Sequence, residues 1–174
     1  MDADAFLDPS NRKRVLEAIA TTLAQEAPIR ETLLIRRVAQ SFGITRAGSR
    51  IQRYLVQLLS TATLPTTLQQ GERFYWPPKQ DPDQYREYRV AGEDDDKRDA
   101  RDLPEQEVAN AAAAVLHSQV GLPEEDLIRE TARLLGYTRL GAYVHTAMRF
   151  GIAYGERKGR LCQSRPGYYT LADS

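Results

Sequence analysis

The side chains best placed for chemistry are four polar residues spaced for one face of a helix. They are Arg46, Arg50, Arg53 and Gln57, which follow one another at intervals of four, three and four positions. Such intervals place side chains on the same face of an α-helix. Guanidinium groups contact phosphates and can pair in a bidentate manner with guanine O6 and N7. We therefore expect this face to bind nucleic acid; a solvated helix face without a ligand is the alternative.

Other basic residues could add contacts to backbone phosphates. In the first half of the chain these are Arg36, Arg37 and Arg73. In the second half a basic group surrounds a glycine and comprises Arg157, Lys158, Arg160 and Arg165. We expect Arg73 and the second group to lie on β-hairpin wings. For the second group, an ordinary charged hairpin tip is the alternative.

Catalysis and metal binding find little support in the sequence. The two histidines, His117 and His145, have no Cys, Asp or Glu partner at ligand spacing. The acidic run at 94–96 offers carboxylates without a rigid scaffold. Cys162 is the single cysteine, so an internal disulfide and a Cys-based zinc site are excluded. We predict a protein that is not an enzyme and that needs no cofactor, no metal and no small-molecule substrate.

The elements that must position these residues occur twice. Residues 34–59 and 127–152 align without a gap, and Gly43 and Gly136 coincide at an offset of 93 positions. Each stretch has apolar residues at helical spacing, then a glycine, then a second helical pattern, which is typical of a helix-turn-helix. A hairpin pattern with aromatic residues follows each stretch. The sequence therefore predicts a mainly α fold with small β wings, arranged as a tandem winged-helix repeat.

The predicted organisation has four parts. They are a flexible leader at 1–8, a first winged-helix unit at 9–78, a charged linker at 79–102 and a second winged-helix unit at 103–174. The third helix of the first unit is predicted from Arg46 to Leu59 with Thr45 as its N-cap. The third helix of the second unit is predicted to end near Phe150, with Gly159 in a wing turn. Tyr85, Tyr88 and Val90 form a segment of the linker that could dock on a neighbour, whereas most of the linker should be solvated.

The second copy does not repeat the basic face of the first. At the four equivalent positions it has Arg139, Tyr143, Thr146 and Phe150. Exposed aromatic side chains mark packing surfaces more often than groove-reading surfaces. We therefore expect Tyr143 and Phe150 to contact the other unit, the linker or a partner protein.

The total charge argues against a strongly basic nucleic-acid binder. The chain of 174 residues has 24 Lys and Arg against 24 Asp and Glu, so its formal net charge is +0. Local patches must carry any electrostatic binding. No apolar run is long enough to cross a bilayer, and the acidic N-terminus has no secretory signal. We therefore expect a cytoplasmic protein without membrane partners.

The repeated motif carries a family resemblance. The stretches LLIRRVAQSFGITRAGSRI and DLIRETARLLGYTRLG resemble the C-terminal domain of unknown function of large bacterial superfamily-one helicase-like proteins, which often include a restriction-endonuclease-like domain. The resemblance implies a fragment of a larger polypeptide, with the helicase and nuclease domains upstream as partners in the same chain. It transfers no catalytic or binding residue. We expect a non-catalytic accessory module that binds duplex or junction DNA; the alternative is a protein-interaction adaptor that does not bind DNA.

Overall fold

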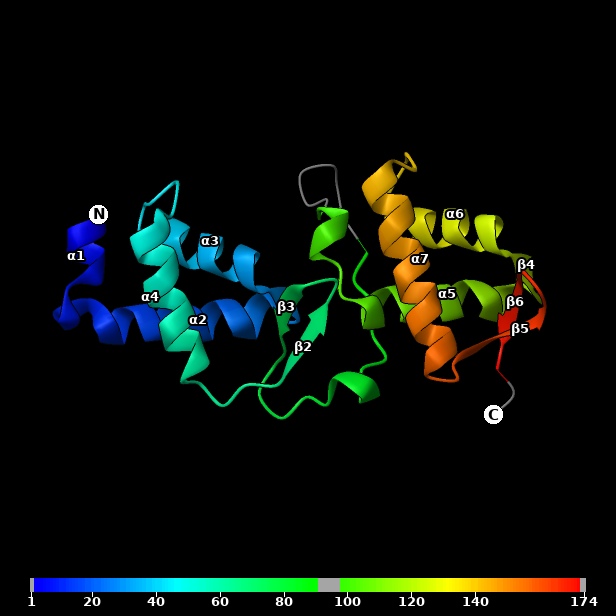
Figure 1. The fold of residues 1–174 in the computed structure, drawn as a ribbon, viewed down its shortest axis with the longest axis horizontal. Coiled ribbons are helices and arrows are strands. Elements are labelled where there is room, and N and C mark those ends of the chain that lie inside the picture. The colour runs from blue at the N-terminus through cyan, green and yellow to red at the C-terminus, as the bar shows by residue number, and fades with distance from the viewer. Residues whose placement is uncertain (1, 91–97, 173–174) are drawn as a thin grey trace. The chain divides into compact units, whose positions relative to one another are not determined.

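The computed structural model describes residues 2–90 and 98–172, which are mainly helical (Figure 1). The strands in this part of the chain form two antiparallel sheets of three strands each. The chain divides into two compact units, Met1–Pro82 and Asp83–Ser174. The predicted solvated run around Asp94 lies outside the described residues.

The first unit combines four α-helices with one sheet in its described part. Its elements, in chain order, are α1 (Ala3–Leu7), η1 (Pro9–Asn11), α2 (Arg12–Glu26), β1 (Ile29–Arg30), α3 (Glu31–Ser41), α4 (Ser49–Ser60), β2 (Thr66–Gln69) and β3 (Glu72–Tyr75). β3 is the middle strand and pairs with both β1 and β2. A short 3-10 turn, η2 (Pro82–Gln84), spans the division between the units.

The core of the first unit joins the inner faces of α2, α3 and α4. Val15, Leu34 and Leu55 are almost completely buried in it, as their helical spacing predicts. Trp76, which directly follows β3, is completely buried, and its Nε1 donates a hydrogen bond of 3.0 Å to Thr67 Oγ1. The polar atom of this large side chain is therefore satisfied inside the unit.

The N-terminal residues differ from the predicted flexible leader. Residues Ala3–Leu7 form α1, which is capped by the Asp2 side chain. Phe6 is completely buried, and its ring centre lies 5.1 Å from that of Phe42 and 6.2 Å from that of Tyr54, in T-shaped arrangements. Burial of this one aromatic ring offsets the entropy lost on ordering a short helix.

Two details of the predicted third helix are wrong. The helix α4 begins at Ser49, and its N-cap is Gly48 rather than Thr45. Arg46 therefore lies in the loop before the helix. Gly43 has a φ of +75°, so the chain leaves α3 through a glycine in the left-handed region.

The described residues of the second unit follow the same element order and contain no counterpart of α1. Its elements are η4 (Ala100–Asp102), α5 (Glu105–Ser118), β4 (Leu122–Pro123), α6 (Glu124–Leu134), α7 (Ala142–Arg157), β5 (Leu161–Arg165) and β6 (Tyr168–Leu171). β6 is the middle strand between β4 and β5. The sheet order therefore repeats that of the first unit.

The third helix of the second unit is longer than predicted. α7 continues past Phe150 to Arg157, and Gly159, with a φ of +67°, follows its end. Two glycines inside α7 allow it to cross α5 closely (Figure 1). A Cβ atom on Gly151 would lie 2.3 Å from Val108, and one on Gly155 would lie 3.0 Å from Leu161. These glycines are thus packing positions in a helix and not its end.

Segments of the predicted linker pack on α5 as part of the second unit. Asn110 Nδ2 donates to the backbone oxygens of Tyr85 and Glu87 at 3.1 and 2.8 Å. Glu107 is completely buried and accepts hydrogen bonds from Arg89 Nη2 at 2.8 Å and Arg98 Nη2 at 2.6 Å. The carboxylate of Glu107 therefore binds one arginine before residues 91–97 and one arginine after them.

Two arginines hold the buried carboxylate of Glu107 in its charged form. Burial alone would raise its pKa, but the hydrogen bonds from Arg98 and Arg89 and their charges outweigh this effect, and the pKa is lowered. Arg98 Nη2 also donates to the backbone oxygen of Arg89 at 2.8 Å, and Tyr137 Oη donates to the Arg98 oxygen at 2.7 Å. A buried charge is tolerated because these partners surround it.

Candidate nucleic-acid interface

A shallow pocket opens where α3 meets the loop before α4. Its volume is about 240 Å³, and its lining is Thr32, Ile35, Arg36, Thr45, Arg46, Ala47 and Gln52. Arg36 and Arg46 are exposed, and neither has a carboxylate partner within the described residues. None of the lining residues is acidic. The pocket therefore combines two uncompensated positive charges with hydroxyl and amide groups.

The outer face of α4 continues this polar surface. Arg53 and Gln57 are exposed and lie one turn apart on the helix, opposite the buried Leu55 and Leu58. Across the part of the chain that the structure describes, Arg53 has no ion-pair partner. Together, Arg36, Arg46 and Arg53 are three uncompensated guanidinium groups on α3, the loop and α4.

The other predicted arginines of the first unit each face a carboxylate. Arg50 Nη1 lies 2.9 Å from Asp4 Oδ1, and Arg37 Nε lies 3.1 Å from Glu26 Oε2. Arg73, on β3, lies 3.8 Å from Glu31 Oε2. Exposed ion pairs of this kind contribute little to stability, but they lower the positive charge that these positions offer to a ligand.

Three of the four predicted wing residues of the second unit lie elsewhere. Because α7 is long, Arg157 is its last residue, and Lys158 and Arg160 follow at once. Lys158 Nζ lies 2.7 Å from Asp83 Oδ2, and Arg160 Nη2 donates to the Asp83 backbone oxygen at 2.6 Å. Arg157 Nη2 lies 3.3 Å from Glu105 Oε2. These cations therefore connect the C-terminal end of α7 with the segment around Asp83 and with the first residue of α5.

The polar partners around Asp83 agree with this structural role. Hydrogen bonds from Lys158 and Tyr154 lower the pKa of the Asp83 carboxyl. Burial, together with the hydrogen bond to Asp83, raises the pKa of Tyr154 to about 12. Of the four, only Arg165 lies in the hairpin of β5 and β6, where its guanidinium is 4.6 Å from the Tyr168 ring centre.

The aromatic face of the second unit is partly covered. Tyr143, on α7, is 66% exposed, and the Arg101 guanidinium lies 4.7 Å from its ring centre. Phe150 is half-buried, and Arg149 lies 5.9 Å from its ring centre. Arg101 belongs to the predicted linker, so the structure shows one linker contact on this face. Arg139 is exposed in the loop before α7.

The second unit differs at the positions that form the pocket of the first. At the offset of 93 positions, Thr32 is replaced by Glu125 and Gln52 by His145. His145 Nε2 lies 3.1 Å from Glu125 Oε2. Arg129, which corresponds to Arg36, lies 2.6 Å from Asp126 Oδ1. The second unit thus has carboxylates on the surface that corresponds to this pocket. The pocket of the first unit has none among its lining residues.

Sequence reasoning missed Thr32 and Gln52. Both are uncharged and were outside the arginine pattern. A position-by-position comparison of the two repeats indicates them, because Thr32 and Gln52 are the uncharged pocket residues that the second copy replaces with titratable residues, Glu125 and His145.

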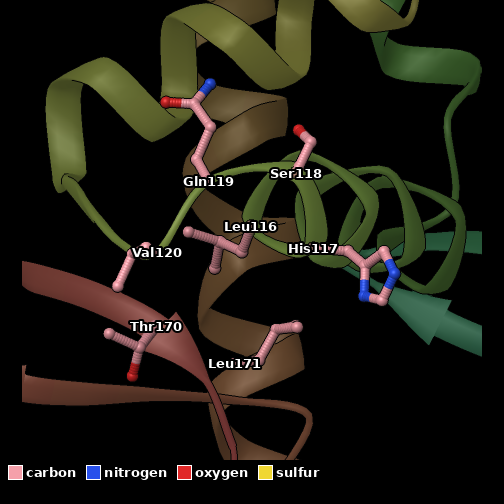
Figure 2. A pocket seen from close by; sticks show the side chains of 7 residues that line it. All are labelled: Leu116, His117, Ser118, Gln119, Val120, Thr170 and Leu171. Atoms are coloured by element: carbon pink, nitrogen blue, oxygen red, sulfur yellow. The ribbon is translucent and has the colours of Figure 1, made fainter.

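A second pocket lies between the end of α5 and β6 in the second unit (Figure 2). Its volume is about 500 Å³, and Figure 2 shows its lining of Leu116, His117, Ser118, Gln119, Val120, Thr170 and Leu171. His117 is the one titratable side chain among these described residues. The pocket therefore offers no pair of groups for acid-base chemistry.

Other classes of site are missing from the described part of the chain. Residues 2–90 and 98–172 contain no group of three or more His, Cys, Asp or Glu side chains arranged to hold a metal ion. No helix in these residues has the length and apolar character needed to cross a membrane.

Comparison with known proteins gives one partial match. A family model described as a protein of unknown function (DUF3320) matches residues 4–53. The match runs from α1 to Arg53 and covers less than half of the chain, so it supports a domain of unknown function in the first unit. No curated protein and no solved structure matches this chain.

Proposed function

We propose that the first unit is a winged-helix module that binds duplex or junction DNA without catalysing a reaction. Its element order of helix, strand, helix, helix and two strands, with the last strand in the middle of the sheet, supports this class. In this class α3 and α4 are the helix-turn-helix, and α4 is the helix that enters the major groove. The second unit repeats the order and supports a tandem arrangement.

The observation that carries the proposal is the pairing pattern of the arginines. Arg36, Arg46 and Arg53 have no carboxylate partner within the described residues, and all three belong to α3, the loop and α4. Other exposed arginines, such as Arg129 and Arg133 on α6, have carboxylate neighbours. Three uncompensated guanidinium groups on one turn motif are better explained by an anionic ligand.

We propose a different role for the second unit. Its aromatic face at Tyr143 and Phe150 is the surface for a protein partner, and Arg165 on its hairpin adds one phosphate contact. Following the resemblance of the repeated motif, we place the module in a larger helicase-like or nuclease-like polypeptide. The competing function is a protein-interaction adaptor, which the 66% exposed Tyr143 favours.

Fluorescence anisotropy with labelled DNA tests the DNA-binding function. Duplex, forked and single-stranded probes are titrated at low and moderate salt with the wild type and with Arg46→Glu/Arg53→Glu. Neutralisation of about three phosphates predicts a log-log salt slope of about −3 for the wild type. The double variant should lose most of the affinity.

The matched control is Arg129→Glu/Arg133→Glu, which changes the net charge by the same amount. Both residues are held by carboxylates on their own helix, α6. This variant should bind DNA like the wild type. If no probe binds at low salt, the DNA-binding function is wrong and the adaptor function gains support. If both double variants bind equally well, the first unit does not bind DNA through Arg46 and Arg53.

A further inference from the structure

The two copies of the repeat carry different residues at two equivalent surface positions. In the second copy, the side chain of Glu125 lies against His145, with its two oxygens 3.1 and 3.2 Å from Nε2. In the first copy the equivalent residues are Thr32 and Gln52, and both line the pocket beside α4. The second copy thus has a carboxylate at the position where the first copy has a hydroxyl.

The pocket of the first copy has the donors that an oxyanion needs. Arg36 and Arg46 are exposed and uncompensated within the described residues, and the Thr32 and Thr45 hydroxyls lie in the same lining. The Gln52 amide donates to the Ala47 backbone oxygen at 2.9 Å, which leaves its second N–H available.

The start of α4 strengthens this set of donors. Its N-cap is Gly48, which makes no side-chain hydrogen bond to the first turn. The N–H groups there are therefore not capped from within the helix, and the N-terminus favours an anion. Ala47 and Gln52, on either side of this cap, both line the pocket.

We propose that this pocket binds one phosphate group of the nucleic-acid backbone, held by Arg36 and Arg46, and that Glu125 replaces this phosphate in the second copy. The proposal rests on the proposed function for the source of the phosphate, a phosphodiester of DNA. It also explains why the two copies differ at this place: a surface that carries its own carboxylate repels a second anion.

The test transfers the carboxylate of the second copy to the first. Thr32→Glu places the residue found at position 125 into the pocket. Thr32 is exposed in the first turn of α3, where a carboxylate suits the helix N-terminus, so the variant should fold. Gln25→Glu on α2 adds the same charge outside the pocket and is the matched control.

Two measurements are made on the full chain. Anisotropy with labelled duplex should show about tenfold weaker binding for Thr32→Glu, with a salt slope reduced by about one, because one phosphate contact is lost. Gln25→Glu should bind like the wild type. In addition, inorganic phosphate at constant ionic strength should shift the NMR signals of the Gln52 side-chain amide in the wild type and not in Thr32→Glu.

The outcomes separate the site from the proposed function. Equal duplex affinity of Thr32→Glu and Gln25→Glu, in a protein that binds DNA, overturns the phosphate site and leaves DNA binding intact. Phosphate-dependent shifts at Gln52 in a protein that binds no DNA support the site and overturn the DNA-binding function. A wild type whose Gln52 signals do not respond to phosphate overturns the site.

Discussion

Asp4 Oδ1 lies 2.9 Å from Arg50 Nη1, so α1 places a carboxylate on an arginine of α4. The two residues are 46 positions apart. Phe6, buried on Phe42 and Tyr54, holds α1 in this position. The N-terminal helix thereby reduces the positive charge of the proposed DNA-binding face.

Removing this carboxylate should strengthen DNA binding. In Asp4→Asn the Arg50 guanidinium becomes available for a phosphate, and the affinity for duplex should rise by about two- to fivefold, as expected for one exposed ion pair. Anisotropy at low salt measures the change. Glu17→Gln removes the same charge from α2 and should have a smaller effect; equal gains would show that net charge alone is responsible.

The buried Glu107 should make the second unit sensitive to acid. Its folded-state pKa is lowered from the ordinary value of 4.5. The stabilisation is therefore fully present above about pH 4.5 and is lost as the pH falls through the lower folded pKa. Urea unfolding at several pH values, followed by circular dichroism, should show a steeper acid loss for the wild type than for Glu107→Gln.

The same variant should be strongly destabilised at neutral pH. Removing one partner of a buried ion pair leaves Arg89 and Arg98 without their carboxylate, which costs about 3 kcal/mol. Glu130→Gln, which breaks an exposed pair with Arg133 on α6, should change the free energy of unfolding by less than about 1 kcal/mol. Similar losses in both variants would contradict the role given to Glu107.

The second unit should need the segment before its first α-helix. A fragment of residues 83–174 retains Arg89, Arg98 and the partners of Asn110, and should unfold cooperatively. A fragment of residues 103–174 loses them and exposes the charge of Glu107, so it should lose protected amides in hydrogen exchange. Equal protection in the two fragments would show that the segment is dispensable.

A buried hydroxyl in α6 should cost stability. Thr131 is completely buried, and its Oγ1 has no hydrogen-bond partner among the described residues. The equivalent residue of the first unit is Val38. Thr131→Val should therefore raise the free energy of unfolding by about 1 kcal/mol, measured by urea denaturation.

The control for this change is Thr22→Val. Thr22 is also buried, but its Oγ1 donates to the Ala18 backbone oxygen at 2.8 Å. Replacing a satisfied hydroxyl should give no gain or a loss. A gain of equal size at both positions would point to general hydrophobicity and not to the unsatisfied group.

Local periodicity was sufficient to predict most helices. Apolar residues at helical spacing, such as Leu34 and Val38, mark buried faces, and Gly43 and Gly136, predicted between two helices, follow the ends of α3 and α6. The prediction that α7 ends near Phe150 was wrong, because the helix continues to Arg157. Gly151 and Gly155 continue the helix beyond that point, and their lack of a side chain lets Val108 of α5 and Leu161 of β5 approach it closely.

The candidate site could be predicted only in part. The exposure of Arg50 and Arg53 follows from the pattern of α4, because a charged face opposes an apolar one, whereas Arg46 lies in the loop before this helix. Which arginines are compensated does not follow, because the partner of Arg50 is remote in sequence. The same limit applies to Arg98 and Glu107, which meet only when the chain before α5 folds back on it.

The position of the single tryptophan has a practical consequence. Trp76 is completely buried in the first unit, and the second unit has no tryptophan. Light at the red edge of the absorption band, where tyrosine absorbs little, excites this indole alone. Its emission therefore follows the unfolding of the first unit, while circular dichroism records both units. The intrinsic tryptophan fluorescence can therefore distinguish the unfolding of the first unit from that of the second without an added dye.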